Sequence, residues 1–285
     1  QFPIPVIGIG NLSMGGTGKT PHIEYFIRLY QNDYKIAVLS RGYGRNTKGY
    51  FEVNPNDEAS RSGDEPLQIK QNFQDILVVV CENRVLGIET ILKAHPEINL
   101  ILLDDAYQHR YVKPSLNILL TPAENPFWKD YVVPAGRLRE FRLGWKRADA
   151  IIITKYENNS IPDYPKYLNT KPVYSSQIVY AKPDLPPCEV IVVSGIVNPK
   201  PMLDYLTKEG YKVVHHFEFK DHHQFTPSDI AAIYDTASKQ SISHVFTTQK
   251  DAVKLLPMWY YKNVMLSALN IEITINNPPQ DWFKL

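Results

Sequence analysis

The sequence has few cysteines, almost no net charge and no long apolar run. Two cysteines, Cys81 and Cys188, are too few for a disulfide framework in 285 residues, which favours a reducing, cytoplasmic setting. A formal net charge of +1 gives no basic excess of the kind that binds nucleic acid. No apolar run approaches the roughly 20 residues that span a bilayer. The sequence therefore predicts a globular protein with neither a nucleic-acid partner nor a membrane-spanning helix.

The alternation of two kinds of segment indicates the fold class. Short β-branched runs predict strands at Pro5–Gly10, Lys35–Ser40, Ile76–Cys81, Asn99–Leu103, Asn117–Thr121 and Ala150–Thr154. Intervening segments such as Pro21–Asn32 and Arg84–Ala94 have helical spacing. Near-continuous apolar strands are typical of parallel sheets that are covered on both faces. We therefore expect an α/β fold of the P-loop NTPase type, with a mostly parallel sheet and right-handed crossovers.

A proline-rich stretch, Tyr156–Pro187, divides the chain. It predicts a linker with one short strand at Val173–Val179. A second set of strands and helices is predicted beyond it, at Glu189–Ser194, Lys200–Glu209, Lys212–Phe219, Ser228–Gln240 and His244–Thr248. We expect a first domain at residues 1–170 and a smaller α/β domain at 171–285, whose last residues are free to return to the first domain.

A glycine-rich loop joins the first predicted strand to the first predicted helix. Its residues are Ser13, Met14, Gly15, Gly16, Thr17, Gly18, Lys19 and Thr20. Glycines in this context let backbone N–H groups converge on phosphate oxygens, and the helix adds the positive end of its dipole. Lys19 is suited to the β- and γ-phosphates, and the Thr20 hydroxyl to Mg²⁺. The loop predicts a site for Mg-ATP, although Ser13 stands where the usual pattern has glycine.

Two aspartates, Asp104 and Asp105, follow the predicted strand Asn99–Leu103. Open α/β sheets bind ligands at the carboxyl ends of their strands, and an aspartate there holds Mg²⁺ directly or through water. Neighbouring residues of a strand point to opposite faces, so the two carboxylates should not do the same work. We assign the metal mainly to Asp105, with Asp104 as its partner and Thr20 as a further ligand. The alternative is an acidic helix cap.

Further polar residues lie in loops at the predicted rim or in Gly/Pro-rich segments. Arginine in such a loop suits a two-point contact with phosphate. We assign Arg139 to the catalytic set, and Arg41, Gln108, His109 and Arg137 to substrate binding. A solvated position is the alternative for the loop arginines.

The segment Gly63–Pro66 precedes a helix that is predicted to start near Pro66. Asp64 or Glu65 would cap that helix, or one of them would take part in chemistry. The residues alone leave both possibilities open.

Together these motifs resemble the tetraacyldisaccharide 4′-kinase family, the lipid A 4′-kinases of Gram-negative bacteria. The matching segments span almost the whole chain in order: Val6–Pro21, Ser40–Gly44, Gly63–Pro66, Leu103–Arg110, Val133–Glu140, Ser194–Pro199, Asp221–Phe225 and Thr247–Leu255. The family commonly has Ser or Thr at the position of Ser13.

The resemblance implies that the γ-phosphate of ATP is transferred to the 4′-hydroxyl of a tetraacyldisaccharide 1-phosphate, which gives lipid IVA. It implies a catalytic base at Asp64, a histidine partner at His222 and a hinge between the two domains. A carboxylate that accepts the hydroxyl proton is what phosphoryl transfer to a sugar needs. The expected partner is the lipid disaccharide, with no obligate protein partner.

A lipid substrate implies peripheral contact with the cytoplasmic face of the inner membrane. The family usually makes this contact with an amphipathic N-terminal segment, and the present sequence starts after it. Aromatic and basic residues at Phe127–Lys129, Tyr131 and Trp145–Arg147 are a candidate second contact. Ordinary core and surface positions are the alternative.

Other functions stay open from the residues. A partner-regulated switch ATPase has a similar loop, but it carries a lysine at the position of Met14. A kinase for a small soluble sugar is a third candidate. A zinc site at His215, His216, His222 and His223 is disfavoured, because adjacent residues of a strand point to opposite faces.

Overall fold

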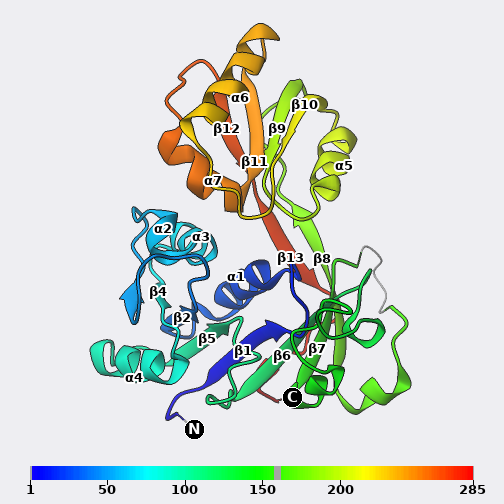
Figure 1. Cartoon of the computed structure of the whole chain (residues 1–285). Helices are drawn as coiled ribbons and strands as arrows, with labels where there is room; N and C mark the ends of the chain where they lie inside the picture. The colour runs from blue at the N-terminus through cyan, green and yellow to red at the C-terminus, as the bar shows by residue number, and fades with distance from the viewer. Residues whose placement is uncertain (1, 157–161, 285) are drawn as a thin grey trace. The chain divides into compact units, whose positions relative to one another are not determined.

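The computed structural model describes residues 2–156 and 162–284. The chain divides into two compact units: unit 1 comprises Gln1–Val179 and Glu272–Leu285, and unit 2 comprises Tyr180–Ile271. The chain leaves unit 1 at the end of strand β8 (Val173–Tyr180) and returns to it in strand β13 (Ile271–Ile275) (Figure 1). Unit 2 is therefore an insertion in the sequence of unit 1.

A mostly parallel sheet forms the centre of unit 1. Among the described residues it has nine strands, in the order β13-β8-β7-β6-β1-β5-β2-β4-β3. Each neighbouring pair from β8 to β4 is parallel, whereas β3 runs antiparallel to β4. Besides β8 and β13, the strands are β1 (Val6–Asn11), β2 (Ile36–Ser40), β3 (Phe51–Glu52), β4 (Leu77–Val80), β5 (Leu100–Asp104), β6 (Leu116–Pro122) and β7 (Ala150–Thr154). The loops that follow the parallel strands consequently share one edge of the sheet.

Helices connect these strands. Helix α1 (Lys19–Tyr30) packs against β1 and β5, α3 (Asp64–Asn72) against β4, and α4 (Arg84–Ala94) against β2. The shorter helical segments of unit 1 are α2 (Ala59–Ser62) and the 3₁₀ turns Phe127–Lys129, Arg142–Arg147, Lys166–Thr170 and Trp282–Lys284. In the described ranges, every helix falls short of the length and apolar character that crossing a bilayer requires.

Apolar side chains of the helices fill the space over the sheet. In α4, Ile88 and Ile91 pack with Leu39 of β2 and Leu103 of β5. Burial of a side chain of this size stabilises the fold by about 1.5–3 kcal/mol. Near the end of the chain, the ring of Trp282 lies edge-on to Phe26 of α1, with 5.2 Å between the ring centroids. The last residues of the chain thus complete the core of unit 1.

Two aromatic residues that were candidates for a membrane interface lie in the core. Phe127 and Trp145 are buried in a cluster with Leu119 and Ile151. For these two residues the structure supports the alternative of ordinary core positions. Tyr131, in contrast, is exposed.

Unit 2 has a smaller parallel sheet with helices. The order of its four described strands is β10-β9-β11-β12, and each neighbouring pair is parallel. Its elements are β9 (Glu189–Ser194), α5 (Lys200–Lys208), β10 (Lys212–Glu218), α6 (Pro227–Lys239), β11 (His244–Thr248), α7 (Gln249–Leu255), the 3₁₀ turn Leu256–Met258 and β12 (Met265–Leu269). Thr226 and Asp229 form a capping box that fixes the start of α6.

The predicted fold class is confirmed by the large, mostly parallel sheet and by the second, smaller sheet. The division between the two units differs from the predicted boundary at residue 170. Residues Val173–Val179, predicted within the linker, lie in unit 1, because their strand pairs with β7. Positions 157–161 of the predicted linker lie outside the described residues.

The junction before α3 fixes the position of Asp64. Gly63 has φ 93° and ψ 152°, a conformation that is almost restricted to glycine. A Cβ atom on Gly63 would also lie 3.0 Å from the carbonyl oxygen of Tyr43. The helix therefore starts at Asp64, two residues before the predicted start at Pro66, and the loop after β2 lies against this start.

Candidate active site

The phosphate loop has the shape that its glycines allow. Gly15 (φ 96°) and Gly18 (φ 85°) are left-handed, a conformation that costs other residues free energy. Ser13 needs no such freedom, because its backbone forms an antiparallel bridge with Leu138. This bridge gives a physical reason why a serine stands where the usual pattern has glycine.

Neighbouring segments hold the loop from several sides. The side chain of Asn11 donates to Thr17 Oγ1 (2.7 Å), and Thr154 Oγ1 donates to the Thr17 carbonyl (3.0 Å). Lys155, directly after β7, donates from Nζ to the Gly16 carbonyl (2.7 Å). These contacts fix the backbone before any ligand arrives, which lowers the entropy cost of binding phosphate.

The segment 137–139 runs along the start of the same loop. The Met14 N–H donates to the Arg137 carbonyl, and the Arg139 N–H donates to the Leu12 carbonyl, each at 2.7 Å. Arg139 is thereby held beside the phosphate loop. The Arg137 side chain instead forms an ion pair with Asp130, at 3.3 Å.

Asp105 lies between two cations. One guanidinium nitrogen of Arg139 donates to both of its carboxylate oxygens, at 2.8 and 2.9 Å, and Lys19 Nζ lies 3.7 Å from Oδ1. Burial alone would raise the pKa of Asp105, but the charges of Lys19 and Arg139 lower it below its usual range. The contacts bring Lys19, Arg139 and Asp105 together.

Asp104 has the opposite environment. It is fully buried, and Ser40 Oγ donates to its Oδ2 at 3.1 Å. Its Oδ1 has no hydrogen-bond partner within residues 2–156 and 162–284. Burial raises the pKa of Asp104 above its usual range, and the carboxylates of Glu65 and Asp105 add to the rise. A buried carboxylate oxygen without a donor is a good ligand for a hard cation.

The residues present therefore fit Mg²⁺. The Thr20 hydroxyl, in the first turn of α1, and the Asp104 carboxylate are both buried oxygen ligands. Asp105, expected from the sequence to be the main ligand, is paired with Lys19 and Arg139. Asp104 has an oxygen that lacks a hydrogen-bond partner among the described residues.

Other predicted site residues have varied roles. Gln108 donates to the Asn11 carbonyl at 2.8 Å, which ties the loop after β5 to the phosphate loop. His109 is partly buried, and burial lowers its pKa, as do the charges of Arg84 and Arg41. Arg41 is exposed. Gln108 and His109 follow β5 in the sequence, and Arg41 directly follows β2, so all three belong to loops at the edge where these strands end.

Asp64 is the first residue of α3, and the N-cap is Gly63, which has no side chain to contribute. The Glu65 N–H donates to Asp64 Oδ1 at 3.0 Å. Both carboxylates lie in the first turn, where the helix dipole favours negative charge. Because the charge of Glu65 also acts on Asp104, the start of α3 belongs to the same electrostatic neighbourhood as the end of β5.

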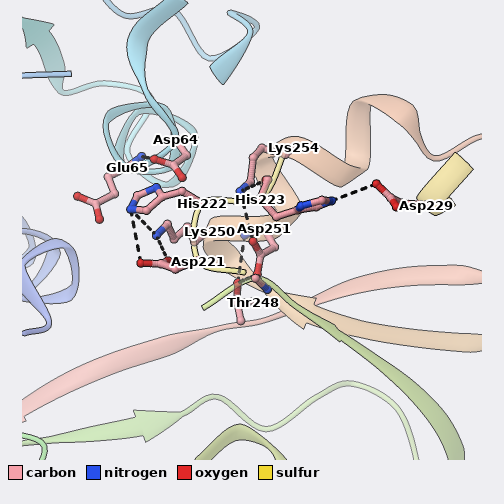
Figure 2. Close-up of polar contacts among 11 residues, drawn as sticks. Asp64, Glu65, Asp221, His222, His223, Asp229, Thr248, Lys250, Asp251 and Lys254 are labelled. Carbon is pink, nitrogen blue, oxygen red and sulfur yellow. Dashed lines mark hydrogen bonds and ion pairs between the residues drawn. The ribbon is translucent and has the colours of Figure 1, made fainter. Parts of the chain in front are cut away.

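In unit 2, His222 is held by two charged neighbours (Figure 2). Lys250 Nζ contacts His222 Nε2 at 3.1 Å and Asp221 Oδ1 at 2.9 Å. An ammonium group only donates, so Nε2 accepts this bond. His222 is also left-handed (φ 60°), an uncommon conformation for a residue other than glycine.

The other histidines of unit 2 have structural contacts. His223 Nε2 lies 3.1 Å from Asp229, the residue that closes the capping box of α6, and Figure 2 shows the ring turned to it. His216 Nε2 lies 2.8 Å from Ser194 Oγ, and His215 packs on Phe217. Over the described residues, the structure has no cluster of three or more His, Cys, Asp and Glu side chains arranged for a metal.

Two lysines that contact candidate residues, one in each unit, were missed by sequence reasoning. Lys155 directly follows β7, so the rule that ligands bind at strand ends would have found it. Lys250 lies in the matching segment Thr247–Leu255, but no local pattern indicates that its ammonium group meets His222.

The chain is similar to known proteins along nearly its whole length. A sequence model described as tetraacyldisaccharide-1-P 4′-kinase matches residues 1–284. A tetraacyldisaccharide 4′-kinase of Bacteroides thetaiotaomicron is 40% identical, over 99% of this chain and 83% of the relative. The same-named protein of Cytophaga hutchinsonii is 37% identical, over 93% of this chain and 82% of the relative.

A solved structure is also similar. It is the crystal structure of LpxK from Aquifex aeolicus in complex with ATP, with 31% identity and a TM-score of 0.77. The similarity covers 97% of this chain and 85% of that chain.

Lys19 provides the test of the phosphate loop. Lys19→Ala is expected to lower ATP turnover by about three orders of magnitude, because its charge would face the phosphates where negative charge develops. Turnover and thermal unfolding are measured together. Lys208→Ala, which removes an exposed lysine of unit 2, is the control and should keep the wild-type rate. Near-normal turnover by a folded Lys19→Ala protein would refute the role.

Proposed function

The chain belongs to the tetraacyldisaccharide 4′-kinase family, and on that premise we propose that it transfers the γ-phosphoryl group of ATP to the 4′-hydroxyl of a tetraacyldisaccharide 1-phosphate. The products are ADP and lipid IVA, an intermediate of lipid A biosynthesis. The match of the family model to residues 1–284 carries the proposal. The phosphate loop, supported by Asn11, Thr154 and Lys155, agrees with it.

In the proposed reaction, the 4′-oxygen forms a bond to the γ-phosphorus while the bond from that phosphorus to the β,γ-bridging oxygen breaks. Backbone N–H groups of the loop and the Lys19 ammonium group bind the β- and γ-phosphates. Arg139 exchanges its contact with Asp105 for the transferred group, since phosphate is an equally good partner for guanidinium. These fixed charges stabilise the negative charge of the transition state.

Thr20 and Asp104 are the residues that would hold Mg²⁺, with Asp105 acting through water. The bound ion would neutralise charge on the β- and γ-phosphate oxygens. The Asp104 carboxylate matches this role, since its Oδ1 is buried without a donor from the described protein.

Asp64 is proposed as the base that accepts the proton of the 4′-hydroxyl. His222 is proposed as the group that orients Asp64 and shares its charge. Lys250 and Asp221 lie beside Nε2 of the His222 ring. An imidazole ring can donate a hydrogen bond to a carboxylate, which is the contact that this role requires. Lys250 and Asp221 thereby act as positioning residues for the ring.

Transfer of labelled phosphate tests the reaction. The protein is incubated with ATP labelled at the γ-position, Mg²⁺ and the tetraacyldisaccharide 1-phosphate, and the lipid is separated by chromatography. Label in the lipid, absent with the Lys19→Ala protein, is the expected result. ATP hydrolysis that depends on a protein partner would indicate a switch ATPase. Label in a soluble sugar, with none in the lipid, would indicate a different kinase.

The proposed pair of Asp64 and His222 makes a second prediction. Loss of a general base typically lowers a rate about 10²–10⁴-fold. Asp64→Ala and His222→Ala should each lower kcat to this extent, with the Kd for ATP little changed. If the two residues act as one unit, the double variant should be scarcely slower than the slower single variant.

The neighbouring histidine gives the matched control. His223→Gln changes the contact with Asp229 and should leave kcat near the wild-type value. Losses that multiply in the double variant would show independent action and contradict the pair.

Peripheral membrane contact at the cytoplasmic face of the inner membrane is part of the proposal. The exposed apolar residues closest in sequence to the 137–139 segment are Tyr131, Val133, Phe141 and Leu143. Two of them, Tyr131 and Phe141, line a mainly apolar cavity of about 260 Å³ together with residues that include Val132 and Leu138. Arg142 lies over the ring of Tyr131, 5.3 Å from its centroid, so a basic group accompanies the apolar ones. This combination is typical of residues at a lipid interface.

Vesicle flotation tests this surface. The double variant Tyr131→Ser and Phe141→Ser should float with phosphatidylethanolamine–phosphatidylglycerol vesicles several-fold less than the wild-type protein, because it loses apolar area. Tyr260→Ser is the control, since Tyr260 is also exposed but belongs to unit 2. Equal flotation of all three proteins, or no flotation of the wild type, would contradict the contact.

A further inference from the structure

His22 is a fully buried histidine beneath the phosphate loop. It lies in the first turn of α1, three residues after Lys19, and it is 0% exposed. Both ring nitrogens have partners: Nδ1 lies 2.7 Å from the carbonyl oxygen of Gly18, and Nε2 lies 3.0 Å from Ser176 Oγ. A core residue would need only to fill space, whereas this ring joins two specific polar groups.

The carbonyl partner fixes the proton position at one ring nitrogen. The Gly18 carbonyl oxygen only accepts, so Nδ1 carries a proton and donates to it. Nε2 contacts the Ser176 hydroxyl, which holds the opposite side of the ring. The ring therefore bridges Ser176 and Gly18.

The hydrogen bond from His22 to Gly18 fixes the orientation of one peptide group in the phosphate loop. The Gly18 carbonyl also accepts from the His22 backbone N–H, at 3.2 Å, so two donors hold this oxygen toward α1. In a trans peptide the C=O and N–H groups point in opposite directions. The Lys19 N–H is thereby aimed away from α1, and as the first N–H of the helix it has no intrahelical partner. The Lys19 N–H therefore points toward the position that an anion occupies at a helix N-terminus.

The other end of the bridge lies on the strand that leads out of unit 1. Ser176 belongs to β8, within which the chain passes to unit 2. The preceding residue, Ser175, accepts from the Asn276 side chain at 2.8 Å, and its carbonyl accepts from the Asn276 N–H at 2.9 Å. Asn276 directly follows β13, the strand on which the chain returns. The anchor of His22 is therefore a fixed part of the sheet.

We propose that His22 is a positioning residue for the phosphates of the nucleotide. Its Nδ1 holds the Gly18–Lys19 peptide so that the Lys19 N–H donates to the β-phosphate, and Ser176 anchors the ring through Nε2. The inference rests on the proposed function only in taking the ligand to be an adenine nucleotide.

Nucleotide binding tests the proposal, because AMP lacks the β-phosphate and ADP has it. The dissociation constants of both are measured by calorimetry for the wild type, His22→Phe and His22→Gln. His22→Phe keeps most of the volume and removes both bonds, so ADP affinity should fall about 10–100-fold, the size of a hydrogen bond to a charged group. AMP affinity should change little. Glutamine, which donates at one atom and accepts at another, should restore part of the loss.

Two serines of β8 provide a matched pair of variants. Ser176→Ala should weaken ADP binding in the same direction as His22→Phe, but less. Ser175→Ala removes an equally buried hydroxyl whose partner is Asn276, and it should leave the ratio of AMP to ADP affinity unchanged. A wild-type-like ratio in both His22 variants, or an equal loss for AMP and ADP, would overturn the proposal. A wild type that binds ADP but transfers no phosphate to lipid would contradict the proposed function alone.

Discussion

The shared direction of the parallel strands in unit 1 is the constraint on which the candidate site depends. Strands that run the same way end at one edge, and residues that follow different strands meet there. Lys155, after β7, reaches the carbonyl of Gly16 in the loop after β1. Ser40, the last residue of β2, reaches the Asp104 carboxylate at the end of β5. The site is therefore assembled from segments far apart in the sequence.

Two neighbouring aspartates at this edge have opposite environments. Asp104 is the last residue of β5 and stays in the sheet, where burial removes it from water. Asp105 has φ 47° and turns away from the strand toward Lys19 and Arg139. Neighbouring residues thus place one carboxylate against a serine hydroxyl and the other against two cations. This difference in charge environment matches the two proposed roles. Asp104 is the metal ligand, and Asp105 is the partner of the phosphate-binding side chains Lys19 and Arg139.

Sequence patterns predicted those parts of the fold that depend on local chemistry. The phosphate loop, the strand before it and the fold class follow from glycine spacing and apolar runs, which act within a few residues. Trp145 illustrates the limit: its aromatic and basic neighbours in sequence suggest a lipid interface, but Leu119 and Ile151 from other strands bury it. The contacts Lys250–His222 and His22–Ser176 could not be predicted either, because each joins residues that only the fold brings together.

The insertion of unit 2 has a consequence for the order in which the protein forms during synthesis. Residues Tyr180–Ile271 are contiguous, so unit 2 can acquire its sheet as soon as it has left the ribosome. Unit 1 cannot close at that time, because β13 and Trp282, which packs on Phe26, are still to be made. The synthesis of unit 1 therefore starts before that of unit 2 and ends after it. The apolar surface that β13 and Trp282 cover stays exposed until both have been made.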